Sequence, residues 1–320
     1  MTFHIKPAQP INDRLLIAIA GPQASGKTTS ALRIATGITQ VTGGKICFID
    51  TENKRALKYA KAFNFNHLEL DPPFSPDRYD EAVKFAENQG YGEGDVIIID
   101  SMSHEHEGPG GVLEIHDQYL ASKNYNPKFN MLGWNVAKKG RKRFISYRLQ
   151  RTPCHIILCF RAKQDLKEQQ VNGQTKYVNE GLAPIGADEY FYEMDISLIL
   201  PLGSMGKPDW TEKNARINEF GQKKPLTELL HNTQQISEET GKQIAEISMI
   251  APPVELTPEQ KTRKLAGDIV RHISTCADAG DLQTVMVDRE HDLEEIKKMS
   301  ESAHQYVKDA YDQRRVELGG

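Results

Sequence analysis

The sequence predicts an α/β protein with a mostly parallel central sheet and a smaller helical region after it. Four short apolar runs are nearly continuous in residues that favour strands, as strands are when both faces of a parallel sheet are covered. Stretches with helical character separate the runs, and such alternation is typical of a parallel sheet with helices on both faces. The runs are Leu15–Ala20, Ile46–Ile49, Val96–Ile99 and Ile156–Phe160.

Local signals predict the elements around these runs. Asn172-Gly173 is a turn signal for a β-hairpin, and Ile196–Leu200 is expected to be a further strand. A single helix, Ser237–Ile247, is expected in residues 226–247, with Ser237 as its N-cap. We also expect helices at Thr28–Ile38, Arg55–Ala62, Asp80–Ala86 and Leu132–Leu149, and a short hairpin or loop at Asp209–Phe220.

The chain is expected to divide into a core (residues 1–249), a linker (250–258) and a C-terminal helical region (259–320). Pro252, Pro253 and Pro258 mark the linker, because proline interrupts regular elements. Beyond it, apolar residues recur at helical spacing, which predicts a small αα-hairpin or bundle. One apolar stripe is Leu265, Ile269 and Ile273, and the other is Leu293, Ile296, Met299, Ala303 and Val307.

Composition limits the classes of protein that remain. The chain is 38% hydrophobic, enough for a real core, and its formal net charge of -4 disfavours a globally basic nucleic-acid coat protein. A nucleic-acid site would therefore be a local basic patch. No apolar run is long enough to span a membrane, and residues 1–13 lack the apolar core of a secretory signal. The four cysteines form no CxxC pair, which favours a reducing cytoplasm and no disulfide or zinc site.

A glycine-rich segment carries the strongest chemical signal. Residues 21–28 match the pattern GxxxxGK[ST], follow the first apolar run and open a predicted helix. Glycines let the backbone wrap closely around phosphate oxygens, and a helix N-terminus favours negative charge. Lys27 is expected to reach the β- and γ-phosphates of ATP, and Thr28 to offer its hydroxyl to Mg²⁺. The predicted nucleotide-binding residues are Gly21, Pro22, Gln23, Ala24, Ser25, Gly26, Lys27, Thr28 and Thr29.

Acidic residues follow two other apolar runs. Asp100 ends the third run, where a carboxylate suits Mg²⁺ coordination, and Glu52 follows the second, where it could orient the attacking water. Glu105 and Glu107 are rivals for the water-orienting role. The alternation of His and Glu in residues 103–107 also allows a metal site, although short alternating polar runs are usually loops.

These segments resemble those of the RecA-like ATPases. Phe48-Ile49-Asp50-Thr51-Glu52 is similar to the segment that carries their catalytic glutamate, and Ile98-Ile99-Asp100-Ser101 is similar to their Mg²⁺-binding strand end. The chain most resembles a phage-encoded RecA-like group of short recombination ATPases, which includes the single-strand-annealing type called "Sak four". The resemblance covers about residues 12–248. It is carried further by Asp100–Glu105, Gly110–Glu114, His155–Leu158, Phe160–Lys163 and Tyr192–Asp195.

By this resemblance Glu52 is the general base, Asp100 joins Thr28 at Mg²⁺, and Lys27 is catalytic. ATP and Mg²⁺ are the implied cofactors. The implied partners are single-stranded DNA, further copies of the chain in a ring or filament, and a single-strand DNA-binding protein. The implied location is the cytoplasm of a bacterial host, with the gene carried by a phage or prophage.

The resemblance also suggests a phosphate sensor. RecA has a glutamine after the strand equivalent to Ile156–Phe160, and this glutamine couples the γ-phosphate to DNA. The position reads Arg161 here, so Arg161 is the expected sensor and catalytic residue, with Lys163 next. RecA-like rings and filaments complete each site with basic residues from a neighbour, and Lys213 and Arg216 are candidates for that role.

The densest basic cluster lies in a predicted helix. Its members Lys138, Lys139, Arg141, Lys142 and Arg143 are candidates for phosphate contacts with nucleic acid, although a solvated helix face is an equally ordinary reading. The predicted hairpin Val171–Glu180 is a second candidate, as a DNA-binding loop.

Three functions fit these observations. The first is a DNA-recombination ATPase that assembles on single-stranded DNA. The second is a hexameric helicase or translocase on the same fold, disfavoured because the sequence lacks an obvious large N-terminal domain for a primase. The third is a P-loop kinase of a small molecule, which would need an arginine-rich lid over an acceptor pocket.

Overall fold

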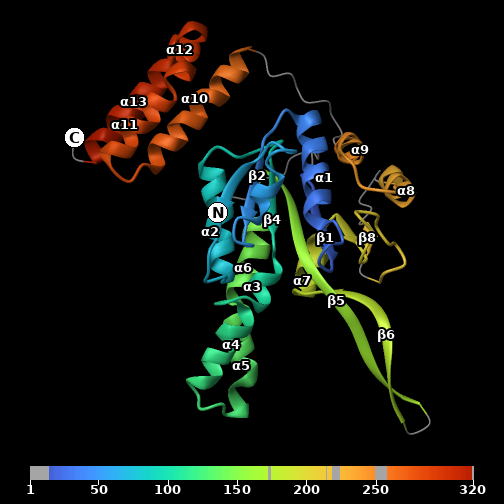
Figure 1. Cartoon of the computed structure of the whole chain (residues 1–320). Coiled ribbons are helices and arrows are strands. Elements are labelled where there is room, and N and C mark those ends of the chain that lie inside the picture. Colours follow the sequence, from blue (N-terminus) through green and yellow to red (C-terminus); the bar gives the residue numbers. More distant parts are fainter. Residues whose placement is uncertain (1–13, 172–173, 214, 218–223, 249–257, 319–320) are drawn as a thin grey trace, which may run out of the picture. The chain divides into compact units, whose positions relative to one another are not determined.

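The protein is described by a computed structural model that covers residues 14–171, 174–213, 215–217, 224–248 and 258–318 (Figure 1). The described strands form a sheet of order β3-β2-β4-β5-β1-β7-β8, and β6 pairs antiparallel with β5. All neighbours from β3 to β7 run parallel, so the predicted α/β class with a mostly parallel sheet is confirmed. The strands are β1 (Leu16–Gly21), β2 (Ile46–Asp50), β3 (Asn66–Glu69), β4 (Val96–Asp100), β5 (His155–Val171), β6 (Gln174–Pro184), β7 (Ile196–Ile199) and β8 (Arg216–Ile217).

Helices lie on both sides of this sheet and continue to the end of the described chain (Figure 1). The helices of the first half are α1 (Lys27–Thr42), the 3-10 helix η1 (Arg55–Tyr59), α2 (Pro76–Asn88), α3 (Ser103–Glu107), α4 (Val112–Ala121), the 3-10 helix η2 (Pro127–Phe129), α5 (Asn130–Ala137), α6 (Lys139–Arg143) and the π-helix η3 (Phe144–Leu149). Those of the second half are α7 (Asp188–Glu193), α8 (Lys224–Asn232), α9 (Glu238–Ser248), α10 (Pro258–Thr275), α11 (Ala279–Asp288), α12 (Glu290–Met299) and α13 (Glu301–Glu317). None of the helices in the described ranges combines the length and apolarity needed to cross a bilayer.

Strand register brings the polar ends of the central strands level. Gly21 of β1 lies opposite Arg161 of β5, and Asp100 of β4 lies opposite Asp50 of β2 and Cys159 of β5. β1, β2 and β4 are buried along their whole length, which explains why they appear as continuous apolar runs. The polar residues that end these strands therefore gather at one edge of the sheet.

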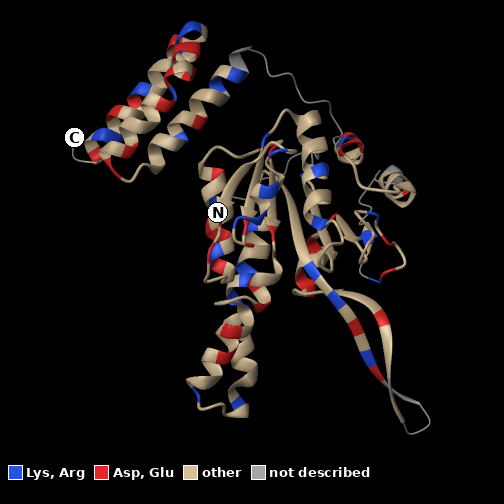
Figure 2. Cartoon of the chain, viewed as in Figure 1, with Lys and Arg blue, Asp and Glu red and all other residues tan. Residues whose placement is uncertain are grey.

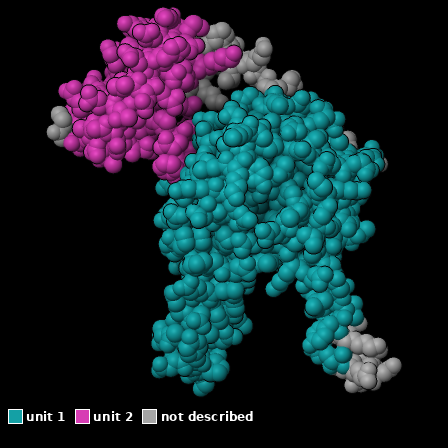
Figure 3. All heavy atoms as spheres, viewed as in Figure 1, with its two compact units in different colours: residues 1–84, 91–251 teal, residues 85–90, 252–320 magenta. Residues whose placement is uncertain are grey.

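The chain forms two compact units, drawn in teal and magenta in Figure 3. Unit 1 comprises residues 1–84 and 91–251, and unit 2 comprises residues 85–90 and 252–320. Unit 2 is a helical bundle around its own core, which includes Ile269, Leu282, Ile296 and Val307. The predicted linker lies outside the described residues except for Pro258, where α10 begins.

Several predicted elements differ from the structure. The second apolar stripe of the C-terminal region belongs to two helices, because the chain turns at Ser300, and Met299 is exposed. Residues 226–247 contain two helices rather than one, since the short helix α8 packs Leu226, Leu229 and Leu230 against the core. β3 has no apolar run, because it is an edge strand whose four residues are not buried.

Two arms project from unit 1 (Figures 1 and 3). One is the helical hairpin α4–α5. The other is the ribbon β5–β6, in which β5 continues well beyond the predicted end at Phe160 and pairs with β6 as far as Val171 and Gln174. The predicted turn residues Asn172 and Gly173 lie outside the described residues.

Candidate nucleotide-hydrolysis site

The phosphate loop joins β1 to α1, in the strand–loop–helix arrangement that the motif requires. Gly26, the residue before α1, has φ of 94°, a left-handed conformation that favours glycine. A Cβ atom on Gly26 would also lie 2.8 Å from the backbone nitrogen of Gly206. The loop can therefore present its N–H groups and the start of α1 to an anion only with glycine at this position.

The side chains of Lys27 and Thr28 lie beside the loop and the end of β4. Lys27 Nζ donates to the carbonyl of Pro22 at 2.8 Å, and burial lowers the pKa of Lys27 despite the nearby Asp100. The hydroxyl of Thr28 donates to Asp100 Oδ2 at 2.6 Å. These two residues present a hydroxyl and a carboxylate oxygen side by side, and oxygen donors of this kind are the ligands that Mg²⁺ prefers. The residues thus fit the magnesium ion that the motif implies.

Glu52 is held on the other side of the cleft by two arginines. Its Oε1 accepts hydrogen bonds from Arg161 at 2.6 and 3.2 Å, and its Oε2 accepts one from Arg55 at 2.8 Å. Burial alone would raise the pKa of Glu52, but the hydrogen bonds from Arg161 and Arg55 lower it on balance. Glu52 is therefore a carboxylate near neutral pH, as a general base must be, although Arg161 occupies one of its oxygens.

Asp50 shapes the loop that carries Glu52, a role that sequence reasoning missed. Asp50 Oδ1 accepts a hydrogen bond from the backbone N–H of Glu52 at 2.7 Å, and Oδ2 accepts one from that of Ala56 at 2.9 Å. His67 Nε2 lies 3.1 Å from the same Oδ2. The sequence did offer a signal for this role. Asp50 precedes a turn and stands two residues before the predicted base, and Asp side chains often accept hydrogen bonds from backbone N–H groups just downstream.

The rival acids lie in different surroundings. Glu105 is fully buried and accepts hydrogen bonds from Arg141 at 2.9 and 2.7 Å, so it does not face the nucleotide cleft. Glu107 lines the cleft. The two imidazoles of this segment diverge, since His104 Nδ1 lies 2.8 Å from Thr51 Oγ1 and His106 Nδ1 lies 3.2 Å from Arg141. Within the described ranges no group of three His, Cys, Asp or Glu residues is placed to hold a metal ion.

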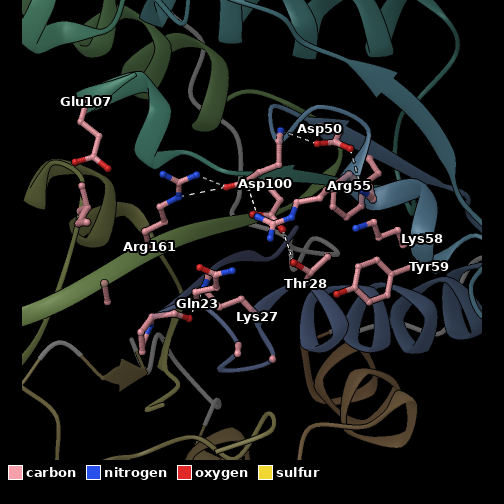
Figure 4. A pocket seen from close by; sticks show the side chains of 18 residues that line it. Gln23, Lys27, Thr28, Asp50, Arg55, Lys58, Tyr59, Asp100, Glu107 and Arg161 are labelled. Atoms are coloured by element: carbon pink, nitrogen blue, oxygen red, sulfur yellow. Dashed lines mark hydrogen bonds and ion pairs between the residues drawn. The ribbon is translucent and has the colours of Figure 1, made fainter. Parts of the chain in front are cut away.

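The phosphate loop, the Thr28–Asp100 pair and Glu52 line a single cleft of about 760 Å³ (Figure 4). Lys27, Thr28, Glu52, Asp100 and Arg161 all line it. Lys163, the second sensor candidate, lines a separate cavity of about 410 Å³ next to Pro22, so the geometry favours Arg161 for contact with nucleotide. The cleft also includes four residues of η1 that sequence reasoning treated only as part of a helix, namely Arg55, Ala56, Lys58 and Tyr59.

The structure corrects the predicted basic face. Arg141 is not on the surface, because its side chain is 2% exposed and paired with Glu105. Arg143 pairs with Asp77, and Lys138 lies 4.0 Å from Glu189. In the part of the chain that the structure describes, Lys139 and Lys142 remain exposed without an acidic partner. Figure 2 shows these positive charges around α6, whereas the β5–β6 ribbon alternates in sign.

The candidates for a role in a neighbouring site have partners within the chain. Lys213 pairs with Asp165 and with Glu180, both on the ribbon. The guanidinium of Arg216 lies 5.2 Å from the centre of the Tyr192 ring.

A phosphate loop after β1, an acid at the end of β4 and a glutamate beyond β2, all at the carboxyl edge of a parallel sheet, define a P-loop nucleotide hydrolase of the RecA-like type. The chain belongs to the AAA domain family, whose model matches residues 13–188.

Curated relatives are similar over a shorter segment. Protein RecA of Treponema denticola is 43% identical over 89 residues, which are 28% of this chain and 21% of that protein. Protein RecA of Borreliella burgdorferi (strain ZS7) is 39% identical over 89 residues, 28% of this chain and 24% of that protein. The chain thus spans about a quarter or less of the RecA proteins it matches.

A solved structure shows a more distant likeness. The genome packaging NTPase B204 from Sulfolobus turreted icosahedral virus 2, in complex with sulfate, is 10% identical with a TM-score of 0.33, over 58% of this chain and 74% of that one. This likeness is too weak to bear on function.

Proposed function

We propose that this chain is a Mg²⁺-dependent ATPase that assembles on single-stranded DNA in recombination or single-strand annealing. The observation that carries the proposal is the single cleft in which Lys27, the Thr28–Asp100 pair and Glu52 converge. The partial similarity to RecA supports DNA as the polymer.

The residues of the cleft divide the work of hydrolysis. The phosphate loop and Lys27 bind the triphosphate, and Thr28 and Asp100 would hold Mg²⁺, which stabilises negative charge on the phosphates. A water oxygen attacks the γ-phosphorus, the bond to the leaving ADP oxygen breaks, and Glu52 accepts the proton of the water. When ATP is bound, Arg161 would leave Glu52 and bind the γ-phosphate instead. One guanidinium cannot make its full set of hydrogen bonds with both anionic groups at once. Arg161 would thus act as the sensor.

An exposed stripe that runs along α6 and η3 and over the two residues after them supports the DNA-binding half of the proposal. Exposed residues recur every three or four positions, include no acid, and carry Tyr147, which is 61% exposed and stacks with Arg151 at 5.0 Å. Cations with an exposed aromatic ring suit a single strand, because the phosphates need charge and the unpaired bases stack. The stripe consists of Lys139, Lys142, Arg143, Ser146, Tyr147, Gln150 and Arg151. The ribbon that contains the Val171–Glu180 candidate is less suited, because acids balance its lysines.

Assembly would bring a second chain to the cleft. We propose Lys213 and Arg216 as the basic residues that a neighbour contributes in a ring or filament. Lys213 would have to exchange Asp165 and Glu180 for a phosphate. A single-strand DNA-binding protein is a proposed further partner, and the cytoplasm of a phage-infected bacterium is the proposed location.

The test compares ATP hydrolysis and DNA binding in wild type and K139E/K142E. We expect single-stranded DNA to stimulate wild-type hydrolysis, and the double variant to bind DNA more weakly with a salt dependence shallower by about 1.4 in slope, for two lost phosphate contacts. K61E/K84E, with the same change in net charge on two exposed lysines elsewhere, is the control. No DNA binding by wild type at low salt, in any nucleotide state, would refute the DNA role.

The other functions make different predictions. A helicase would open a duplex in an unwinding assay, whereas an annealing protein would close it. A small-molecule kinase needs an arginine-rich lid, but the ribbon that could cover the cleft has no arginine between residues 162 and 184. No structural observation favours either alternative.

A further inference from the structure

His104 lies at the start of α3, between the end of β4 and the loop that carries Glu52. Its side chain is 14% exposed, and its ring stacks on Phe74 with centroids 4.9 Å apart. Nδ1 lies 2.8 Å from Thr51 Oγ1, and Nε2 lies 3.9 Å from Glu52 Oε1. Nδ1 is thus in hydrogen-bonding contact with Thr51, the residue before the proposed base, whereas Nε2 faces the carboxylate of Glu52 itself.

Thr51 and Glu52 lie on either side of the His104 ring and together favour one tautomer. The Thr51 hydroxyl accepts a hydrogen bond from the backbone N–H of Ser101 at 2.8 Å, and its single proton can go to the Ser101 carbonyl at 3.2 Å or to His104 Nδ1 at 2.8 Å. The negatively charged Glu52 carboxylate faces Nε2, so the tautomer with its proton on Nε2 is the one that Glu52 stabilises, with Nδ1 accepting from Thr51. Burial, followed by the charge of Arg161, lowers the pKa of His104, so the ring is neutral near pH 7. His104 therefore points an uncharged N–H group at Glu52.

In the present arrangement Arg161 holds the oxygen that His104 faces. Both Arg161 Nε and a terminal nitrogen of Arg161 donate to Glu52 Oε1. A distance of 3.9 Å is too long for a hydrogen bond, but a closure of about 1 Å would make one. Once the guanidinium of Arg161 leaves, Glu52 Oε1 has lost its hydrogen-bond donors. The side chains of His104 and Glu52 can then approach to hydrogen-bonding distance.

We propose, on the basis of the function proposed above, that His104 is a positioning residue for Glu52. When Arg161 turns to the γ-phosphate, the Nε2–H group of His104 replaces it on Oε1 and keeps the carboxylate aimed at the attacking water. No proton is transferred to or from His104 in this exchange.

A neutral donor suits this position better than a second cation. Arginine beside a carboxylate stabilises its negative charge strongly and so weakens it as a base, whereas a neutral N–H group orients the carboxylate with a smaller effect. Orientation matters because a displacement of about 1 Å in a reacting group can lower the rate about 100-fold.

Two substitutions of His104 distinguish the role of Nδ1 from that of Nε2. The amide of Asn can replace Nδ1 and bind Thr51 without reaching Glu52, whereas the amide of Gln can place a donor where Nε2 stands. We expect H104A and H104N to lower kcat for ATP hydrolysis by about 10- to 100-fold without a change in KM or in the Kd of a fluorescent ATP analogue. H104Q should restore most of the wild-type kcat.

The control is H106Q, which changes the next histidine of the same helix, on the side that faces Arg141. It should hydrolyse ATP like wild type. Wild-type kcat in H104N, or equal losses in H104Q and H104A, would overturn the inference, because His104 would then serve only to hold Thr51 or to pack. A wild-type protein that binds the analogue without hydrolysing ATP would instead overturn the proposed function itself.

Discussion

Replacement of Arg141 by methionine tests whether this arginine is structural or binds nucleic acid. Arg141 and Glu105 are 2% and 0% exposed, and the guanidinium donates to both carboxylate oxygens at distances down to 2.7 Å. Methionine has a similar length but no charge, so R141M leaves the Glu105 carboxylate buried without its partner. Breaking a buried pair in this way costs about 3–5 kcal/mol in unfolding free energy.

The loss should depend on pH, with a definite sign. Burial raises the pKa of Glu105, whereas the hydrogen bond and charge of Arg141 oppose that rise. In R141M the opposing effect is gone, so the pKa of Glu105 in the folded state rises further above its unfolded value. The folded protein then binds a proton that the unfolded chain releases, and its stability falls as the pH rises between those two pKa values. At the acidic end of this interval Glu105 is protonated, and the buried neutral carboxyl lowers the free energy of unfolding less than the buried carboxylate does.

Urea unfolding followed by tryptophan fluorescence measures this effect in unit 1, because Trp134 and Trp210 both belong to it. With a slope of about 3 kcal/mol per molar urea, the midpoint of R141M should fall by about 1–1.7 M near pH 8 and by less near pH 5. E105Q/R141M, which removes both charges, should lose the additional pH dependence. R141M with wild-type stability at pH 8 and reduced DNA binding would refute the structural role and return Arg141 to the DNA-binding surface.

Three further predictions concern the cleft and unit 2. E52Q should lower kcat by about 100- to 10,000-fold, because the amide cannot accept the proton of water, and should leave the Kd of an ATP analogue within error of wild type. Equal losses in kcat and in affinity for the analogue would indicate that Glu52 binds nucleotide instead. G26A should abolish binding of that analogue, since the residue needs φ of 94° and a Cβ would meet the Gly206 nitrogen at 2.8 Å; retained affinity would contradict the loop geometry. S300A removes the cap in which Ser300 Oγ accepts a hydrogen bond from the Ala303 N–H at 3.2 Å, and should destabilise unit 2 by about 1 kcal/mol in a circular-dichroism melt. S274A removes an exposed hydroxyl of the same unit that caps no helix, and should leave the melt unchanged.

Short-range patterns were sufficient for much of the fold and part of the site. The phosphate loop is encoded within eight residues, because glycine positions, a lysine and a hydroxyl act through local backbone geometry. The central strands were visible because burial on both faces requires uninterrupted apolar residues. β3 and α8 left little trace, since an edge strand needs few apolar residues and α8 is too short for its three leucines to form an extended periodic pattern.

Tertiary structure decided which charged residues meet. Arg141 and its neighbours look alike along the chain, yet only Arg141 points inward, where Glu105 compensates its charge. The register of β2, β4 and β5 brings Asp50, Asp100 and Arg161 to one edge, and with them the Glu52 that Arg161 holds. The role of His104 depends on contacts between segments about 50 residues apart. The sequence alone therefore determined that a phosphate-loop motif follows the first strand, because that motif is local. The partner of each charge came from long-range packing, which no local pattern encodes.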